Sequence, residues 1–157
     1  MLSEFARAYI NASVPVLSER SLIITHIFNR NFFKTYPEIK HAFNVECKTL
    51  GIQQLPFALI LFAYAANIDR ADKFLPIIRR IALKYSSWGI SVDDYPIIAN
   101  FLLEAIKETL GYAATTHLLA AWAEAFGLFT NALVQEGVKF KRELSANQVE
   151  MENMNVI

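Results

Sequence analysis

The sequence predicts a single all-α domain of seven or eight helices, and three observations lead to that prediction. Apolar residues recur at the three- and four-residue spacing of amphipathic helices, and no segment alternates apolar and polar residues long enough to form a strand. The 157 residues are enough for one sizeable core. The expected helices differ in length and have short connections, which favours crossed packing over a parallel bundle.

The helices are expected, in order, at residues 3–17, 19–34, 37–43, 53–68, 71–84, 92–110 and 117–144. Ser3 is a suitable N-cap for the first, Ser91 with Asp94 forms a capping-box pattern, and Thr115 or Thr116 caps the last. Residues 44–52 are polar and are expected to form a loop. The domain therefore covers residues 1–144, and residues 145–157 form a polar tail without a core-facing stripe, which we expect to be frayed or disordered.

Composition excludes several classes of partner. Fifteen basic residues balance fifteen acidic ones, so no charged surface for nucleic acid is expected. The longest apolar stretch, residues 55–68, is too short to span a bilayer, so no membrane partner is expected. The single cysteine, Cys47, excludes an intramolecular disulfide and suits a reducing compartment, which with the absence of a signal pattern predicts a cytoplasmic protein.

Several short stretches carry a family resemblance. They are FNRNFFKTYPEIKHAFN at residues 28–44, AYAANI at 63–68, LP at 75–76, YPII at 95–98, LLEAIKE at 102–108 and AWAEAFG at 121–127. In this order the chain resembles bacterial single-domain haemoglobins and the globin domain of flavohaemoglobins over roughly residues 1–142. The resemblance implies a globin fold, with helices 53–68 and 71–84 on either side of a haem pocket. Flavohaemoglobins continue into a flavin reductase domain, so we expect this chain not to draw electrons from NADH by itself.

The resemblance also assigns residues to the pocket. Phe43 matches the phenylalanine that packs flat on the haem, although a phenylalanine also fills apolar space without a ligand. Gln53 matches the distal glutamine, with an exposed capping residue as the alternative. Phe57 replaces a smaller leucine over the iron, so it narrows or fills the distal space. Lys84, the neighbour of Tyr85, and Ile98, in the matching stretch YPII, complete the expected pocket.

Three departures from the family alter its chemistry together. Asn29 replaces the distal tyrosine that steadies bound oxygen, and Tyr85 replaces the proximal histidine that holds the iron. Tyr95 matches the tyrosine of the pair that supports that histidine, but its carboxylate partner is replaced by Gly137. Loss of a ligand, its support and the distal donor indicates a change of chemistry rather than fine tuning.

Tyr85 is the candidate metal ligand, because tyrosine holds haem iron in some proteins; a tyrosine packed on an apolar helix is the alternative. None of the three histidines lies in the segment 71–84, so we interpret His26, His41 and His117 as core or surface residues. An anionic oxygen ligand favours ferric iron, whereas dioxygen binds ferrous iron. Reversible oxygen carriage is therefore not expected.

Four functions remain open. The chain binds ferric haem through Tyr85 or apolar contact alone, or it binds an open-chain tetrapyrrole such as biliverdin, which needs no axial ligand. A ligand-free interaction or sensor module is the alternative from another class. Haem-dependent detoxification of nitric oxide or oxygen with a separate reductase is a further one, so a binding protein is predicted more strongly than an enzyme.

Self-association is also expected. The last helix carries six large apolar residues, more than one buried stripe needs: Leu118, Leu119, Trp122, Phe126, Phe129 and Leu133. Pairing of two identical helix faces covers such an excess, and the resemblance points the same way, so a homodimer is predicted. The alternative is that these residues face the subunit's own core or its ligand.

Overall fold

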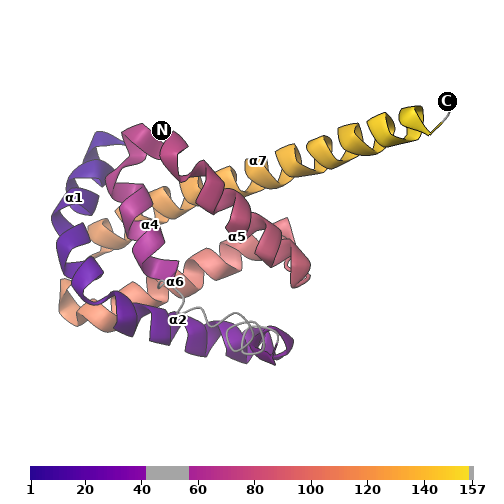
Figure 1. Cartoon of the computed structure of the whole chain (residues 1–157). Helices are drawn as coiled ribbons and strands as arrows, with labels where there is room; N and C mark the ends of the chain where they lie inside the picture. Colours follow the sequence, from indigo (N-terminus) through magenta and orange to yellow (C-terminus); the bar gives the residue numbers. More distant parts are fainter. Residues whose placement is uncertain (42–56, 156–157) are drawn as a thin grey trace.

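The computed structural model describes residues 1–41 and 57–155, and they form helices without a strand (Figure 1). The α-helices are α1 (Glu4–Glu19), α2 (Ser21–Thr35), α4 (Phe57–Ala66), α5 (Leu75–Ser87), α6 (Tyr95–Leu110) and α7 (Thr116–Met154). Short 3-10 helices η1 (Ile68–Phe74), η2 (Val92–Asp94) and η3 (Gly111–Ala113) join them. Residues 37–41 are helical too. The all-α prediction is confirmed, whereas the expected loop at 44–52 lies outside the described residues.

The predicted caps form. The Ser3 hydroxyl accepts a hydrogen bond from the Ala6 N–H at 3.2 Å, and the Thr115 hydroxyl accepts one from the Leu118 N–H at 3.2 Å. The Ser91 N–H donates to the Asp94 carboxylate at 2.9 Å as part of a capping box. These side chains satisfy N–H groups that have no partner inside the helix, so they fix where α1, η2 with α6, and α7 begin.

Two boundaries within the described residues differ from the expectation by four residues or more. Residues 71–74 belong to the 3-10 helix η1, and α5 begins only at Leu75. Pro76, which has no N–H to donate, suits the first turn of α5 and disfavours helix before it. At the other end, α7 continues to Met154, so the expectation of a frayed or disordered tail is wrong over residues 145–154. These residues are exposed and polar as predicted, but they contain no glycine or proline to stop the helix.

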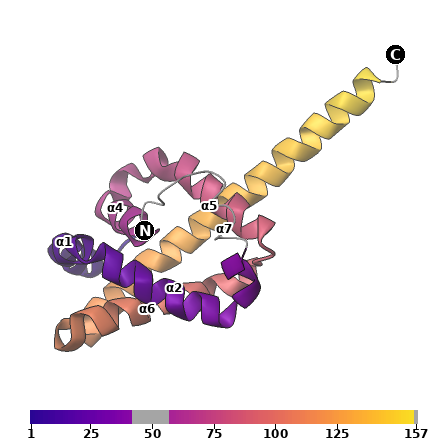
Figure 2. The same ribbon diagram turned by 60° about the horizontal axis from the view of Figure 1, so that its bottom comes forward.

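Helix α7 is the central element of the core. It packs against α1, α4, α5 and α6, while α2 packs against α4 and α6. Its C-terminal part extends away from the other helices in two different views (Figures 1 and 2). Among the described helices, α7 alone has the length and apolar composition of a membrane span, but most of its large apolar side chains between Leu118 and Leu133 are buried in the core. It is therefore explained as the core helix of a folded domain.

The apolar excess of α7 lies inside the subunit. Leu118 is 7 % exposed, Leu119 is half-buried, and the other four residues of the predicted dimer face are at most 2 % exposed. The observation behind the predicted homodimer is therefore accounted for by the subunit's own core. The apolar residues that remain exposed on α7 lie further along it, and they are Val138, Leu144, Val149, Met151 and Met154.

Candidate ligand cavity

A small cavity lies where four helices meet. Leu61 of α4, Tyr85 of α5, Tyr95 and Ile98 of α6, and Phe129 and Leu133 of α7 are among its lining residues. Helices α4 and α5 thus reach the same cavity from different sides. Its volume is about 10 Å³, which is room for about one water molecule. The described lining is almost wholly apolar apart from its tyrosines and Thr130.

Tyr85 is enclosed by other aromatic rings. Its ring centroid lies 6.2 Å from that of Tyr95, 6.1 Å from that of Trp88 and 6.5 Å from that of Phe32. The residue is only 7 % exposed, and burial, with a smaller contribution from Tyr95, raises the pKa of the Tyr85 phenol. The phenol is therefore neutral at physiological pH, and it becomes an anion only beside a strong positive charge.

Tyr95 reaches the cavity because of the capping box before it. The turn Val92–Asp94 leads directly into α6, which places Tyr95 in the first turn of that helix with 7 % of its surface exposed. Burial also raises its pKa. Gly137, which stands where the resemblance places a carboxylate partner for Tyr95, has open space at the position of a Cβ atom. Packing alone therefore does not require glycine there.

The structure brings three of the sequence-predicted site residues together. Tyr85, Tyr95 and Ile98 all line the cavity, whereas Asn29 on α2 and Lys84 on α5 are half-buried and are not among its lining residues. Phe43 and Gln53 lie outside the described residues, and so does the side chain of Phe57. The binding roles of all eight residues stay predictions.

No histidine enters the cavity. His26, His41 and His117 are exposed, and His117 packs at the surface against the rings of Phe5 and Tyr9. Among residues 1–41 and 57–155 there is also no group of three or more histidine, cysteine, aspartate or glutamate side chains able to hold a metal ion. The described lining therefore offers two phenol oxygens, Tyr85 and Tyr95, and Tyr85 is the one that the resemblance places at the proximal position.

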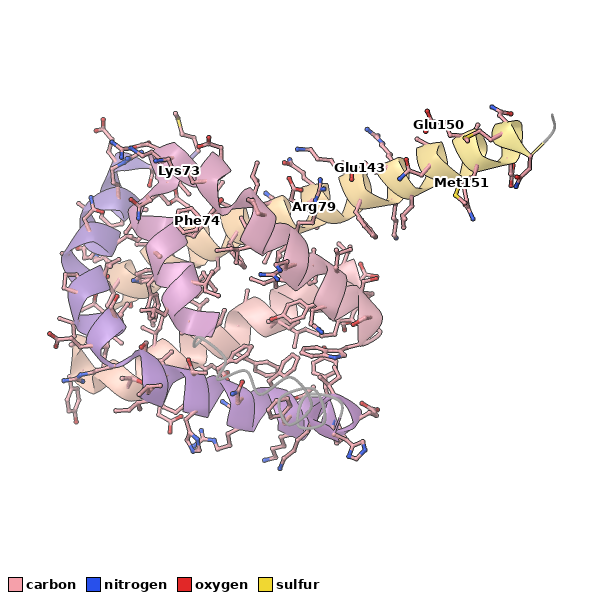
Figure 3. All side chains as sticks on the ribbon, viewed as in Figure 1. Lys73, Phe74, Arg79, Glu143, Glu150 and Met151 are labelled. Carbon is pink, nitrogen blue, oxygen red and sulfur yellow. The ribbon has the colours of Figure 1, made fainter. Side chains whose placement is uncertain are left out.

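The sequence interpretation missed a buried acidic residue, Glu136. It is 3 % exposed and accepts hydrogen bonds from Arg79 Nε at 3.0 Å and from Lys139 Nζ at 3.3 Å. Arg79 also donates to both carboxylate oxygens of Glu143, at 3.2 and 3.3 Å, and Figure 3 shows these two residues side by side between α5 and α7. Glu136 lies on the same helix face as the apolar residues Phe129 and Leu133, and this spacing could have indicated from the sequence that it is buried.

Comparison with known proteins decides the family. The chain is 42 % identical over 134 residues to a flavohemoprotein of Chromobacterium violaceum, a match that covers 85 % of this chain and 33 % of that protein. An engineered carbene transferase from Rhodothermus marinus is 33 % identical, with a TM-score of 0.73 and coverage of 92 % of this chain and 99 % of that one. A bacterial globin from Campylobacter jejuni is 26 % identical, with a TM-score of 0.74 and coverages of 89 % and 99 %. No family model matches the chain.

The chain belongs to the globin family. More closely, it belongs with single-domain bacterial globins and the globin domain of flavohaemoglobins, and the predicted globin fold is confirmed. The globin spans about a third of the length of the flavohemoprotein that it matches. The cavity between α4, α5, α6 and α7 is thus formed within a globin fold.

Proposed function

We propose that this globin binds ferric haem at the cavity between α4, α5, α6 and α7, where the oxygen of Tyr85 would hold the iron. The observation that carries the proposal is a buried tyrosine lining an apolar cavity in which the described residues place no histidine. The relative from Chromobacterium violaceum is named a flavohemoprotein, which supports haem as the ligand class. Tyrosine is an established ligand of haem iron.

The chemistry of the described lining suits haem, but the volume that the described residues enclose is smaller than a haem pocket. The apolar lining suits a porphyrin ring, and Tyr85 supplies an oxygen donor. The described residues enclose about 10 Å³, far less than the roughly 300 Å³ of the smallest ligand pockets, and Phe43 and Gln53, which the resemblance places in the pocket, lie outside the described residues. Haem would supply a ferric centre able to accept the phenolate.

In the proposed function, the protein controls the protonation of Tyr85 and holds its ring in position. Tyr85 is a neutral phenol before binding, so it must lose its proton to become a ligand. The neighbouring rings of Tyr95, Trp88 and Phe32 hold it in place and keep water away. Because an anionic ligand favours the ferric state, we expect poor oxygen binding.

Titration with hemin tests this proposal. The wild-type protein should give an absorption spectrum typical of ferric haem with a phenolate ligand, and Tyr85→Phe should lose its charge-transfer band. Tyr85→His should bind hemin more tightly and form an oxygen complex after reduction. A wild-type spectrum that Tyr85→Phe leaves unchanged would exclude Tyr85 as the ligand.

The small cavity also supports a second candidate, a ligand-free interaction or sensor module. Between α4, α5, α6 and α7 the described side chains leave room for about one water molecule, so this part of the core packs without a ligand. Purification from the native host separates the possibilities. A colourless protein that takes up no hemin supports the module, a Soret band supports haem, and broad red absorption supports biliverdin or another bilin.

Detoxification of nitric oxide or oxygen with a separate reductase is a weaker candidate, because a ferric phenolate disfavours the ferrous, oxygen-binding form. A cytoplasmic location and a homodimer also stay predictions. The dimer has lost its original support, since the apolar face of α7 is buried in the subunit. Light scattering at micromolar concentration tests it, with 17.8 kDa as the mass of one chain.

A further inference from the structure

Glu136 is a charged group in the core that is fully paired. Both of its carboxylate oxygens accept hydrogen bonds, Oε2 from Arg79 and Oε1 from Lys139, and the side chain is 4 % exposed. The other interhelical ion pairs among the described residues are more exposed, such as Arg30–Glu108 with side-chain exposures of 53 % and 51 %. A buried carboxylate is tolerated only with such partners, so Glu136 depends strongly on Arg79.

Arg79 joins its helix to α7 at two points. Its Nε binds Glu136, and its two terminal nitrogens bind Glu143, which lies two helical turns further along α7 (Figure 3). The planar guanidinium group holds both carboxylates in a fixed geometry. Two attachments along one helix restrict both sliding and rotation of α5 on α7.

The same two helices form one wall of the cavity. Tyr85 lies six residues after Arg79, about 9 Å along α5 at the rise of a helix. On α7, Leu133 lines the cavity one turn before Glu136. Any shift of α5 along α7 therefore moves the Tyr85 ring relative to the cavity.

Glu136 directly precedes Gly137, the position at which the family resemblance implies an acidic residue. The family resemblance implies a carboxylate at 137 that supports the proximal ligand from within the pocket, whereas here the acid one residue earlier binds Arg79 of α5. We infer that Arg79 and Glu136 are positioning residues that hold α5, and through it Tyr85, in the register that presents the phenol to the cavity. The ligand part of this inference rests on the proposed function, and its structural part does not.

Fluorine NMR of protein labelled with 5-fluorotryptophan tests the structural part without any ligand. The two tryptophans give two resonances: Trp88 contacts the Tyr85 ring, and Trp122 lies in the core four turns before Glu136. Glu136→Gln should shift the Trp88 resonance and leave that of Trp122 in place. Glu108→Gln, the same change in the Arg30–Glu108 pair between α2 and α6, is the matched control and should shift neither.

Hemin binding by the same variants tests the ligand part. Glu136→Gln should bind hemin about tenfold more weakly, the usual scale for loss of a group that orients a metal ligand, with a shifted ferric band. Glu108→Gln should match the wild type. If the wild type binds no hemin, the proposed function fails while the NMR result still decides the positioning role.

An unshifted Trp88 resonance in folded Glu136→Gln would overturn the inference. If that variant does not fold, Arg79→Lys replaces it, because lysine keeps the charge but cannot hold two carboxylates in one plane. Arg79→Lys should move the Trp88 resonance in a folded protein. A resonance that stays at the wild-type position would overturn the inference as well.

Discussion

The two ends of the core are built differently. Around Trp122 the packing is closed, because its ring lies 5.2 Å from that of Phe62, its indole N–H donates to the Ser13 hydroxyl at 3.0 Å, and it is fully buried. Around Tyr85, helices α4, α5, α6 and α7 leave a small cavity, and the buried rings of Tyr85 and Tyr95 lie 6.2 Å apart beside it. The closed end packs the core of the globin fold, while the proposed ligand chemistry is confined to the cavity end.

The largest effect on stability is expected at the closed end. Trp122→Ala should lower the free energy of unfolding by about 3–5 kcal/mol, because it removes a large buried ring and leaves a cavity. Tyr85→Phe, at the cavity end, removes a single hydroxyl and should cost less than about 1.5 kcal/mol. Urea unfolding followed by circular dichroism measures both. Equal losses would mean that the two ends contribute equally to the fold.

The cavity end should instead respond to pH when hemin is added. The pKa of Tyr85 is raised by burial, so the phenol is protonated throughout the range from pH 6 to 8 in the free protein. Binding as a phenolate releases that proton, so affinity should rise with pH, by up to about tenfold per unit or 1.4 kcal/mol. Tyr85→Phe, measured at each pH, should lack this dependence. A falling or flat wild-type profile contradicts phenolate ligation.

A smaller effect on stability is expected when the helix caps Ser91 and Thr115 are removed. Ser91→Ala and Thr115→Ala should each lower the free energy of unfolding by about 1 kcal/mol, since each removes a helix N-cap. Only Ser91 belongs to the turn that leads into Tyr95, so only its loss should change the near-ultraviolet circular dichroism of the tyrosines. The same spectral change in both variants would show that the cap does not act on the cavity.

The difference between the two ends also explains how much could be predicted from sequence. Apolar periodicity and caps such as Ser3 and Thr115 are local signals, so the helices followed from them, whereas their globin packing was implied by the family resemblance. Tyr85, Tyr95 and Ile98 were assigned by resemblance, and the structure places them around one cavity. The size of that cavity depends on side chains from four helices, which no local pattern encodes.

Glu136 is a second feature that local sequence patterns do not predict. A pattern of apolar residues treats an acid on the core face as an interruption, although here it is the acid that joins α7 to α5. Its partner Arg79 is 57 residues away in the sequence, so only the folded chain brings the charges together. The continuation of α7 past Leu144 was missed for a different reason, because polar composition does not by itself end a helix.

The smallest effect is expected from removing that continuation. A chain ending after Leu144 keeps Glu136 and Glu143 with Arg79. Of the segment that it loses, residues 145–155 are exposed and extend away from the domain in Figures 1 and 2. Its free energy of unfolding should therefore change by less than about 0.5 kcal/mol. A chain ending after Phe140 also loses Glu143, which should weaken the α5–α7 contact and cost more.

Urea unfolding measures the stability of the full chain and of the two shortened proteins, and light scattering measures their masses. Equal stability of the full chain and the chain ending after Leu144 would support a domain of residues 1–144. A loss of more than about 1 kcal/mol would mean that the removed segment contributes to the fold despite the exposure of residues 145–155. Light scattering would then compare the masses of the full chain and the chain ending after Leu144. If the full chain has twice the mass of one chain and the shortened protein has the mass of one chain, the dimer contact includes the exposed residues Val149, Met151 and Met154 rather than the buried face of α7.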